Sequence, residues 1–351
     1  MPTIVDVARL ARVSTATVSN ALSGRRPVAP ETRDRVQAVA KRLGYRPNHV
    51  AASMVTGRTR TIGVVVPDIS NPFFSELVRA AENAAGSRGY MTLVASSELD
   101  AALEDRYVDV MHDKRVDALL YLPGTGRLPA GLGGILAADT PLVVLDEALP
   151  SAPAGASIIT TDNERGGEIV ARHLLDLGHR HIGVIGGPRS LPTSRQRLAG
   201  FRRGLRRAGI PLERSRARHA AAYTRADGAE AARRLLAQDA RITALFCAND
   251  LIALGALEAA RGIRRAVPGD LSIAGFDDIF VSELVSPSLT TVRQPIGRLG
   301  KEAAELAIDL IEGRATGPQR QLLPVELVVR ESTGAAPLGR GLGVGTLAAR
   351  A

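Results

Sequence analysis

Residues 6–24, DVARLARVSTATVSNALSG, carry the pattern that decides how the chain begins to fold. Apolar residues recur at helical spacing just before and within this stretch: Ile4, Val7, Ala8 and Ala11. The spacing predicts a helix with one buried face, which Thr3 can cap with Asp6 three residues later. The pattern breaks at residues 12–13, and Ser14 can cap a second helix. The stretch therefore predicts two short helices joined by a tight turn.

The second helix, which Gly24 can end, has two different faces. Its apolar face consists of Val18, Ala21 and Leu22. Its opposite face is small and polar: Ala16, Asn20 and Ser23, flanked by Thr17 and Ser19. A face of this kind can enter a groove and contact base edges, and the spacing is typical of a helix-turn-helix with its recognition helix.

The positive charge of the chain is concentrated at this end. The 351 residues carry a net charge of +9, and residues 1–60 hold eleven Arg or Lys against three Asp or Glu, whereas the rest of the chain is at +1. A basic module on a near-neutral body is typical of a protein that binds the phosphate backbone of nucleic acid. This distribution favours a DNA-binding module over the alternative, a small helical cap on a larger domain.

Composition limits the other possibilities. Apolar residues make up 45% of the chain, which is enough for real cores, and Cys247 is the single cysteine, so no disulfide framework can form. Arg9 and Arg12 interrupt any signal-peptide-like apolar run, and no segment approaches membrane-spanning length. We therefore expect a soluble cytoplasmic protein without a membrane partner.

A third helix and a linker follow the basic loop after Gly24. The third helix can start at Pro30 and end at Gly44, and its buried stripe consists of Val36, Val39, Ala40 and Leu43. Asn48 can cap a helix running to about residue 56, which is so short that a partner would be needed to order it. Residues 57–60 are expected to be linker.

From Thr61 onward, short β-rich runs alternate with longer helical patterns. The predicted strands are residues 62–67, 91–96, 118–122, 142–146, 157–161, 182–186, 244–248, 273–276 and 325–329. The predicted helices include residues 73–88, 165–177, 195–208, 226–237 and 296–311. The alternation predicts an α/β core with parallel sheets covered on both faces, and its length predicts two doubly wound lobes. Ligands of such sheets bind at the carboxyl ends of strands, so we expect a cleft between the lobes.

Several long motifs, in order, resemble the lactose-repressor family of bacterial transcription regulators along roughly residues 2–334. They are TIVDVARLARVSTATVSNAL, TRDRVQAVAKRLGYRPN, IGVVVPDISNPFF, RVDALL, TDNERGG, LGHRHIGVIGG, RLAGF, FCANDLIALGAL, DLSIAGFDD and PSLTTVRQP. The resemblance implies a sequence-specific regulator, most simply a repressor, that binds a near-palindromic double-stranded DNA operator as a homodimer. It also implies a core like that of periplasmic sugar-binding proteins, with a small effector, a sugar in the first instance, between the lobes.

The resemblance also implies a division of the chain. The expected parts are a helix-turn-helix headpiece at 1–46, a hinge helix and linker at 47–60, a two-lobe core at 61–334 and a disordered tail at 335–351. Within the core, the first lobe is expected at about 61–162 and 292–322 and the second at about 163–291 and 323–334. The chain is expected to cross between lobes near Asp162, Thr291 and Leu323. The tail lacks heptads, which favours a dimer over a tail-built tetramer.

Functional residues follow from the same resemblance. The implied DNA contacts are Thr15, Ala16, Thr17, Ser19, Asn20, Arg26, Val50 and Met54. Asn20 can pair with adenine in the major groove, and Met54 stands where the family has a hinge leucine that wedges into the minor groove. The implied effector contacts are Phe73, Phe74, Thr193, Arg197, Tyr223, Asn249, Asp250 and Asp277. One of the two phenylalanines is expected to be core, and Asn249 and Asp250 can alternatively be read as caps of the helix that follows them.

Other classes of function fit less well. The purine-binding branch of the family has an arginine where Leu191 stands and an aromatic residue where Glu147 stands, so purine effectors are disfavoured. A sugar-binding transport protein is the main alternative, but it explains neither the basic headpiece nor the missing signal peptide. An enzyme is disfavoured because neither a nucleotide fingerprint nor a nucleophile–base set stands out. No metal or cofactor is expected, and His173, His179 and His181 are expected at the surface.

Overall fold

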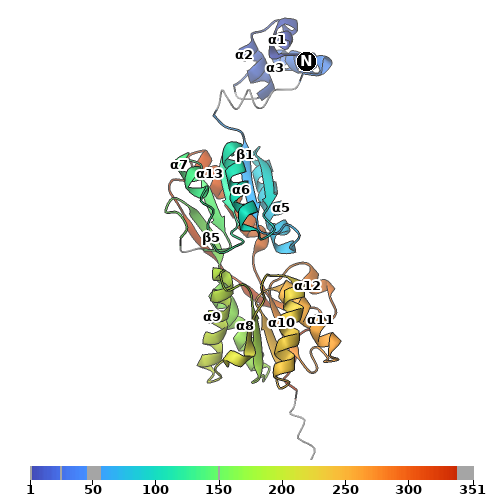
Figure 1. Ribbon diagram of the computed structural model, residues 1–351. Helices are drawn as coiled ribbons and strands as arrows, with labels where there is room; N and C mark the ends of the chain where they lie inside the picture. The colour runs from blue at the N-terminus through green and yellow to red at the C-terminus, as the bar shows by residue number, and fades with distance from the viewer. Residues whose placement is uncertain (1, 24–25, 46–56, 149–150, 338–351) are drawn as a thin grey trace, which may run out of the picture. The chain divides into compact units, whose positions relative to one another are not determined.

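The computed structural model describes residues 2–23, 26–45, 57–148 and 151–337 of the chain (Figure 1). It divides into two compact units, Met1–Thr59 and Arg60–Ala351. The first unit is helical, and the second contains two parallel-sheet lobes. This is the fold class that the sequence predicts.

The first unit consists of three helices around a small apolar core. They are α1 (Ile4–Ala11), α2 (Thr15–Ser23) and α3 (Pro30–Leu43). Val7, Ala11, Val18 and Val36 are completely buried between them. The predicted caps are confirmed, because Thr3 and Asp6 form a reciprocal capping box on α1 and Gly44, at φ +64°, ends α3. The predicted hinge helix and Gly24 lie outside the described residues.

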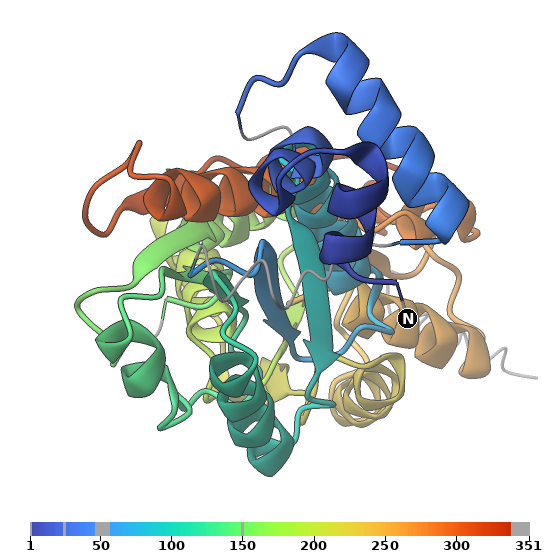
Figure 2. The same cartoon turned by 90° about the horizontal axis from the view of Figure 1, so that it is seen from above.

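The first lobe of the second unit is built on a six-stranded, all-parallel sheet in the order β11-β5-β4-β3-β1-β2. Its strands are β1 (Thr61–Val66), β2 (Met91–Ser96), β3 (Ala118–Tyr121), β4 (Leu142–Leu145), β5 (Ser157–Thr161) and β11 (Arg320–Leu323). Its helices are α5 (Pro72–Ser87), α6 (Ala101–Asp113), α7 (Leu132–Ala137) and α13 (Ile296–Ile311). Helices α5 and α13 cover one face and α6 and α7 the other, and Figure 2 shows α13 and α6 on opposite sides of the strands.

The second lobe repeats this plan with the strand order β12-β10-β9-β8-β6-β7. Its strands are β6 (Ile182–Gly186), β7 (Ala217–His219), β8 (Ala244–Cys247), β9 (Ser272–Asp277), β10 (Thr290–Arg293) and β12 (Glu326–Val328). Its helices are α8 (Asn163–Asp176), α9 (Pro192–Arg207), α10 (Arg225–Gln238), α11 (Asp250–Gly262) and the short α12 (Val281–Leu284), with a 3-10 turn at Arg214–Arg216. Strand β12 is antiparallel to β10, and the other pairs are parallel.

The chain crosses between the lobes three times: after β5, after β10 and after β11. The first and third crossings fall at the expected positions, whereas the second comes after Arg293, about two residues later than expected. The sequence analysis did not predict β7, β10 or β11. Each is three or four residues long, lies at or next to a sheet edge and contains too few apolar residues to show the pattern of a buried strand.

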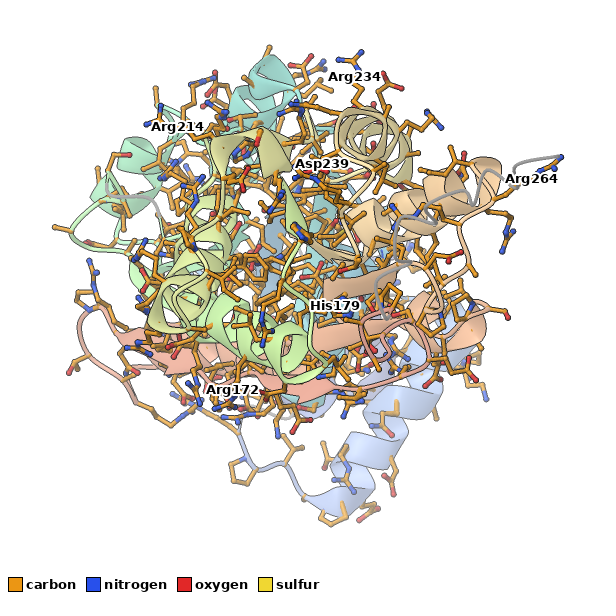
Figure 3. The ribbon with its side chains drawn as sticks, turned by 90° about the horizontal axis from the view of Figure 1, so that it is seen from below. Arg172, His179, Arg214, Arg234, Asp239 and Arg264 are labelled. Atoms are coloured by element: carbon orange, nitrogen blue, oxygen red, sulfur yellow. The ribbon has the colours of Figure 1, made fainter. Side chains whose placement is uncertain are left out.

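The end of the second lobe away from the cleft corrects two further expectations (Figure 3). His179, expected at the surface, is completely buried; its Nδ1 lies 2.9 Å from Thr243 Oγ1, and its Nε2 lies 3.0 Å from Ser272 Oγ. Burial lowers the pKa of its imidazole, so the ring stays neutral. Ala336, expected in the disordered tail, donates its backbone N–H to Leu177 O at 2.8 Å. Residues 338–351 lie outside the described residues.

The near-neutral body hides an uneven distribution of charge between the lobes. Residues 61–162 carry 14 acidic and 6 basic side chains, whereas residues 163–293 carry 13 acidic and 21 basic ones. In the second lobe, Arg206 and Arg207 lie in the last turn of α9, and Arg261 lies in the last turn of α11. Cations at these positions interact favourably with helix carboxyl ends. Part of the excess positive charge therefore has a structural role.

Glycines let pairs of helices approach closely. A Cβ on Gly200 of α9 would lie 1.9 Å from Glu164 O, and one on Gly167 of α8 would lie 2.1 Å from Arg197 O. Across the first lobe, a Cβ on Gly300 of α13 would lie 2.2 Å from Leu77 O. Because these neighbours are backbone atoms, they cannot move aside without shifting a helix.

We therefore expect Gly200→Ala to destabilise the protein by about 2–4 kcal/mol, because α8 and α9 must separate to admit the methyl group. Gly86→Ala is the matched control: it lies in α5 with nothing within 4 Å of its added Cβ. That change should instead be neutral or stabilise the protein by up to about 1 kcal/mol. Urea denaturation followed by circular dichroism measures both effects, and equal stabilities for the two variants would contradict the close-packing account.

Candidate DNA-contacting helix and effector cleft

Helix α2 presents a small polar surface to solvent. Val18 and Ala21 are buried, whereas Thr15, Ala16 and Ser19 are exposed and Thr17 and Asn20 are half-buried. The predicted cap is present, since Ser14 Oγ accepts a hydrogen bond from the Thr17 backbone N–H at 3.1 Å. The predicted inward residues are thus buried or half-buried and the predicted outward residues exposed or half-buried, while the Ser23 side chain lies outside the described part of the structure. Arg26 is exposed after the turn, and Val50 and Met54 lie outside the described residues.

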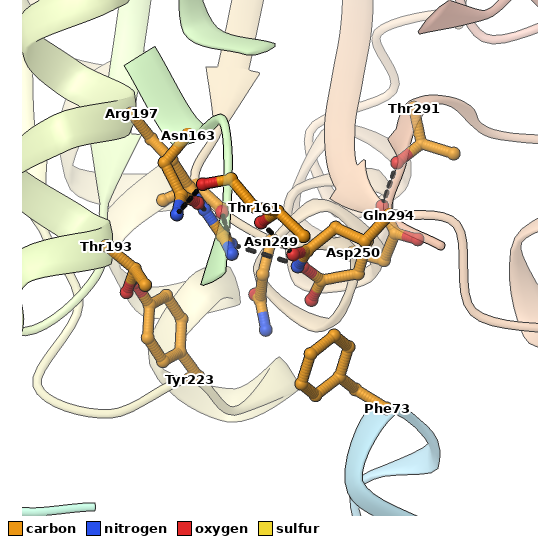
Figure 4. A network of polar contacts seen from close by, with 12 residues as sticks. Phe73, Thr161, Asn163, Thr193, Arg197, Tyr223, Asn249, Asp250, Thr291 and Gln294 are labelled. Atoms are coloured by element: carbon orange, nitrogen blue, oxygen red, sulfur yellow. Dashed lines mark hydrogen bonds and ion pairs between the residues drawn. The ribbon is translucent and has the colours of Figure 1, made fainter. Parts of the chain in front are cut away.

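A ring of buried hydrogen bonds lies where the chain crosses between the lobes (Figure 4). Thr161 at the end of β5 donates its hydroxyl to Gln294 Oε1, and Gln294 Nε2 donates to Asp277 Oδ1 at 2.7 Å. Arg197 Nη1 also reaches Asp277 Oδ1, at 3.1 Å, while Arg197 Nε donates to Asn163 Oδ1 at 2.7 Å. The ring closes where Asn163 Nδ2 donates to Thr161 O at 3.1 Å. Two of the three crossings are thereby tied to β9 and α9.

Arg197 and Asp277 are the charged pair of this ring. Both are at most 5% exposed, and the guanidinium also donates to Ala248 O at 2.6 Å and lies 3.9 Å from the centroid of the Phe276 ring. Burial raises the pKa of Asp277, and the adjacent Arg197 guanidinium opposes this shift and favours the charged carboxylate. Asp277 also has φ +119°, a strained backbone angle for a residue with a side chain. Arg197 and Asp277, both expected from the sequence to contact an effector, are thus paired with each other.

Asn249 and Asp250 have separate roles at the start of α11. Asn249 Oδ1 accepts from the Ile252 N–H at 2.9 Å, which makes Asn249 the helix cap, and its amide nitrogen points toward Tyr223 and Phe73 in Figure 4. Asp250 is completely buried. Its carboxylate accepts from the Ile279 N–H, the Ser282 hydroxyl and the Thr291 hydroxyl. These contacts give Asp250 a structural role, which differs from the helix-cap role considered for it in the sequence analysis.

A small cavity of about 40 Å³ lies between the lobes. Its walls include Phe74, Leu191, Tyr223, Asp146 and Glu147, contributed by both lobes. Phe73 is instead buried in the core of the first lobe, so one of the two phenylalanines is core and the other lines the cavity. A volume of this size holds a few water molecules and is well below the roughly 300 Å³ of an ordinary ligand pocket.

Glu147 joins the lobes across this cavity. Its carboxylate accepts hydrogen bonds from the Thr193 N–H at 2.9 Å and from the Thr193 hydroxyl. Helix α9 has no side-chain cap of its own at Leu191, so a carboxylate of the first lobe satisfies the amino end of a second-lobe helix. Burial, followed by repulsion from Asp146, raises the pKa of Glu147 to about 8.

Sequence reasoning missed Asn163, Gln294, Asp146 and Glu147 as members of the site. Each follows a strand end by one or two residues: β4 ends at Leu145, β5 at Thr161 and β10 at Arg293. Polar residues directly after a parallel strand are the signal that could have found them. Among the described residues, no group of three His, Cys, Asp or Glu side chains could hold a metal ion, and no helix is long and apolar enough to cross a membrane.

A three-helix unit with a polar helix face, followed along the chain by a unit of two parallel-sheet lobes, defines a class: a DNA-binding regulator with a periplasmic-binding-protein-like core. Comparisons with known proteins agree. Residues 3–48 match the model of bacterial regulatory proteins of the lacI family, and residues 171–333 match a periplasmic binding protein-like domain. Among curated relatives, the HTH-type transcriptional regulator DegA of Bacillus subtilis is 37% identical over 333 residues, covering 94% of this chain and 98% of DegA. The HTH-type transcriptional repressor CytR of Escherichia coli K12 is 36% identical, covering 95% and 97%.

Solved structures agree with these relatives. A lac repressor dimer bound to operator and the anti-inducer ONPF matches with a TM-score of 0.81 at 30% identity, covering 95% of this chain and 99% of that one. A complex of the transcriptional regulator CelR with cellobiose matches with a TM-score of 0.73 at 32% identity, covering 95% and 100%. The chain belongs to the lacI family, as the resemblance implies. Its relatives are transcription regulators and not enzymes.

The raised pKa of Glu147 predicts a pH effect on stability. A carboxyl group whose pKa is higher in the folded than in the unfolded state stabilises the fold most at low pH, and this contribution is lost as pH rises from about 4 to about 8. Glu147→Gln should therefore flatten the fall in Tm between pH 5 and 8.5. An exposed control, Glu82→Gln, should keep the wild-type profile. Two parallel profiles for wild type and Glu147→Gln would show that the carboxyl titrates normally.

Proposed function

We propose that this protein is a transcription repressor that binds a near-palindromic operator as a homodimer, in the cytoplasm, and is released or modulated by a small sugar in its cleft. One observation supports operator binding: the small polar face of α2 belongs to a unit that holds nearly all of the chain's excess positive charge. Backbone phosphates supply affinity to such a unit, while side chains on the outer face of α2 supply specificity.

Asn20 is the best residue on which to test base reading. A side-chain amide can donate to and accept from adenine at once, which discriminates by about 1–3 kcal/mol. Asn20→Ala should weaken binding to the promoter next to the protein's own gene by roughly 10- to 100-fold in fluorescence anisotropy. Gln37→Ala is the matched control, because it removes an exposed amide from α3. Equal losses in the two variants, or no loss with Asn20→Ala, would contradict base reading by α2.

A sugar effector is supported by the polar lining of the cleft and by relatives. One similar regulator is solved with cellobiose and another with ribose. Here the proposed mechanism is a coupled equilibrium: a ligand that binds one degree of lobe closure better than another changes the spacing of the two linkers in a dimer. Only such differential affinity can shift the equilibrium and change the grip on DNA.

The proposed homodimer is supported by exposed apolar side chains on the second lobe. Phe280 and Leu284, at the start and end of α12, are 60% and 71% exposed. A second copy of the chain is the occupant that fits, since the similar lac repressor structure is a dimer on its operator. Covering two such side chains is worth about 1.5–3 kcal/mol each.

Phe280→Asp combined with Leu284→Asp should therefore shift the protein from twice 37.0 kDa toward 37.0 kDa in light scattering after size exclusion. Leu322→Asp, a change at a 63% exposed residue of edge strand β11, should leave the mass unchanged. A double variant that keeps the dimer mass would place the interface elsewhere.

A further inference from the structure

A second pocket lies in the second lobe, and Arg264, labelled in Figure 3, is part of its wall. Its volume is about 320 Å³, which is within the range of pockets that hold small molecules. Its lining combines arginines with apolar and small residues: Leu257, Arg261, Arg264, Arg265, Ala266, Val267, Ser286 and Pro287. The described lining therefore contains three cations and no acidic residue.

The pocket lies at the edge of the sheet opposite the cleft. Helix α11 begins at Asp250, on the cleft side, and ends at Gly262, next to the pocket. Arg265 Nη2 donates to Ile242 O and Asp270 O, and these carbonyls stand two residues before β8 and β9. The lining of this pocket shares no residue with that of the cavity between the lobes. A ligand bound here would therefore occupy a separate site.

The arginines of the pocket form no ion pair with a carboxylate in the described part of the chain. Arg261 Nη2 donates to a backbone carbonyl, Ser286 O, at a long distance of 3.4 Å. Arg265 donates to the two backbone carbonyls named above, whereas the exposed Arg264 side chain makes no hydrogen bond or ion pair with the described residues. The guanidinium groups of Arg261 and Arg264 therefore retain donors for a ligand.

These side chains are not needed to complete the end of α11. The backbone N–H groups of residues 263–265 donate to the carbonyls of residues 259–261, which closes the last turn. The charge of Arg261 favours this helix end, but that effect does not use its hydrogen-bond donors. Arg264 has φ +58°, the left-handed conformation in which glycine commonly follows a helix. An arginine thus occupies a position where glycine would be less strained.

Electrostatics at this end of the lobe favour an anion. Burial lowers the pKa of Arg265, which means that the charged guanidinium is destabilised there and that a nearby anion would stabilise it. Asp270 is the acidic residue that acts on Arg265, and its Oδ2 already accepts from the Ala266 N–H at 2.9 Å. One carboxylate offsets the charge of three guanidinium groups only in part.

We propose that this pocket binds a compact oxyanion, meaning a small molecule with a phosphate or carboxylate group. A guanidinium presents its donors in a planar fork that matches two oxygens of such a group, and two arginines here have donors to offer. Leu257, Val267 and Pro287 add an apolar wall for the remainder of the ligand. The site lies outside the effector cleft, so the proposal goes beyond the proposed function and does not depend on it.

Isothermal titration calorimetry on the full chain tests the site with pyrophosphate and citrate as anions and glycerol as an uncharged probe. At about 0.15 M salt, we expect at least one of the two anions to bind and glycerol not to bind. The two anions distinguish the sources of the shared chemistry, since pyrophosphate presents phosphate oxygens and citrate carboxylate oxygens. Arg264→Gln should weaken the binding by about 10-fold or more, because it removes a charged donor from an exposed position without protein partners.

Arg206→Gln is the matched control, because Arg206 is an exposed arginine in the last turn of α9 and does not line this pocket. It should leave anion affinity unchanged, including any binding by the basic headpiece. Arg261→Gln is a second variant and should weaken the binding as Arg264→Gln does. The Tm of each variant, measured in parallel, checks that it is folded.

The proposal is overturned if neither anion binds at up to about 10 mM, or if Arg206→Gln weakens binding as much as Arg264→Gln does. The second result would show a general attraction to a basic surface. Binding that appears only in the double variant Phe280→Asp and Leu284→Asp would show that a second copy fills the pocket, and would also overturn the proposal. Promoter binding, followed by anisotropy, reports separately on the proposed function, which survives any of these results.

Discussion

The buried ion pair between Arg197 and Asp277 is the interaction on which the geometry of the sensor depends. It sits in a closed ring of hydrogen bonds that includes Thr161, Asn163 and Gln294, residues at two of the three places where the chain passes between lobes. Burying two charges is unfavourable unless they are paired and hydrogen-bonded, and the ring supplies such partners to both Arg197 and Asp277.

A second contact joins the two lobes at the cavity between them. Helix α9 starts without a side-chain cap, and Glu147 of the other lobe supplies the missing acceptor through Thr193. The contact stands at the edge of the cavity of about 40 Å³, so a change in the separation of the lobes would alter both the contact and the cavity. Two lobe arrangements with different affinities for a ligand are what a switch requires.

Much of the fold could be predicted from the sequence because its determinants are local. Residues close together in the sequence are enough to predict the capping box at Thr3, the buried stripe of α3 and the long apolar strands. The short strands β7, β10 and β11 could not be predicted, because pairing with neighbours far along the chain decides their structure. The choice of Arg197 and Asp277 as effector contacts followed from the family resemblance, and neither residue is among those that line the cavity. The sequence alone does not show which side chains lie close together in the fold. It therefore could not show that Arg197 pairs with Asp277, or that Asp250 accepts hydrogen bonds from β10 and α12.

We propose that binding in the cleft and binding to DNA are coupled in one molecule. Coupling between two sites is reciprocal, so each ligand must change the affinity of the other by the same factor. The most direct measurement is a pair of titrations on the intact chain: operator affinity with and without a cleft-binding compound that raises Tm, and compound affinity with and without operator. If the two sites are coupled, operator affinity and compound affinity should change by the same factor, about 5-fold or more. Coupling would be contradicted if operator affinity did not change with the compound and compound affinity did not change with the operator.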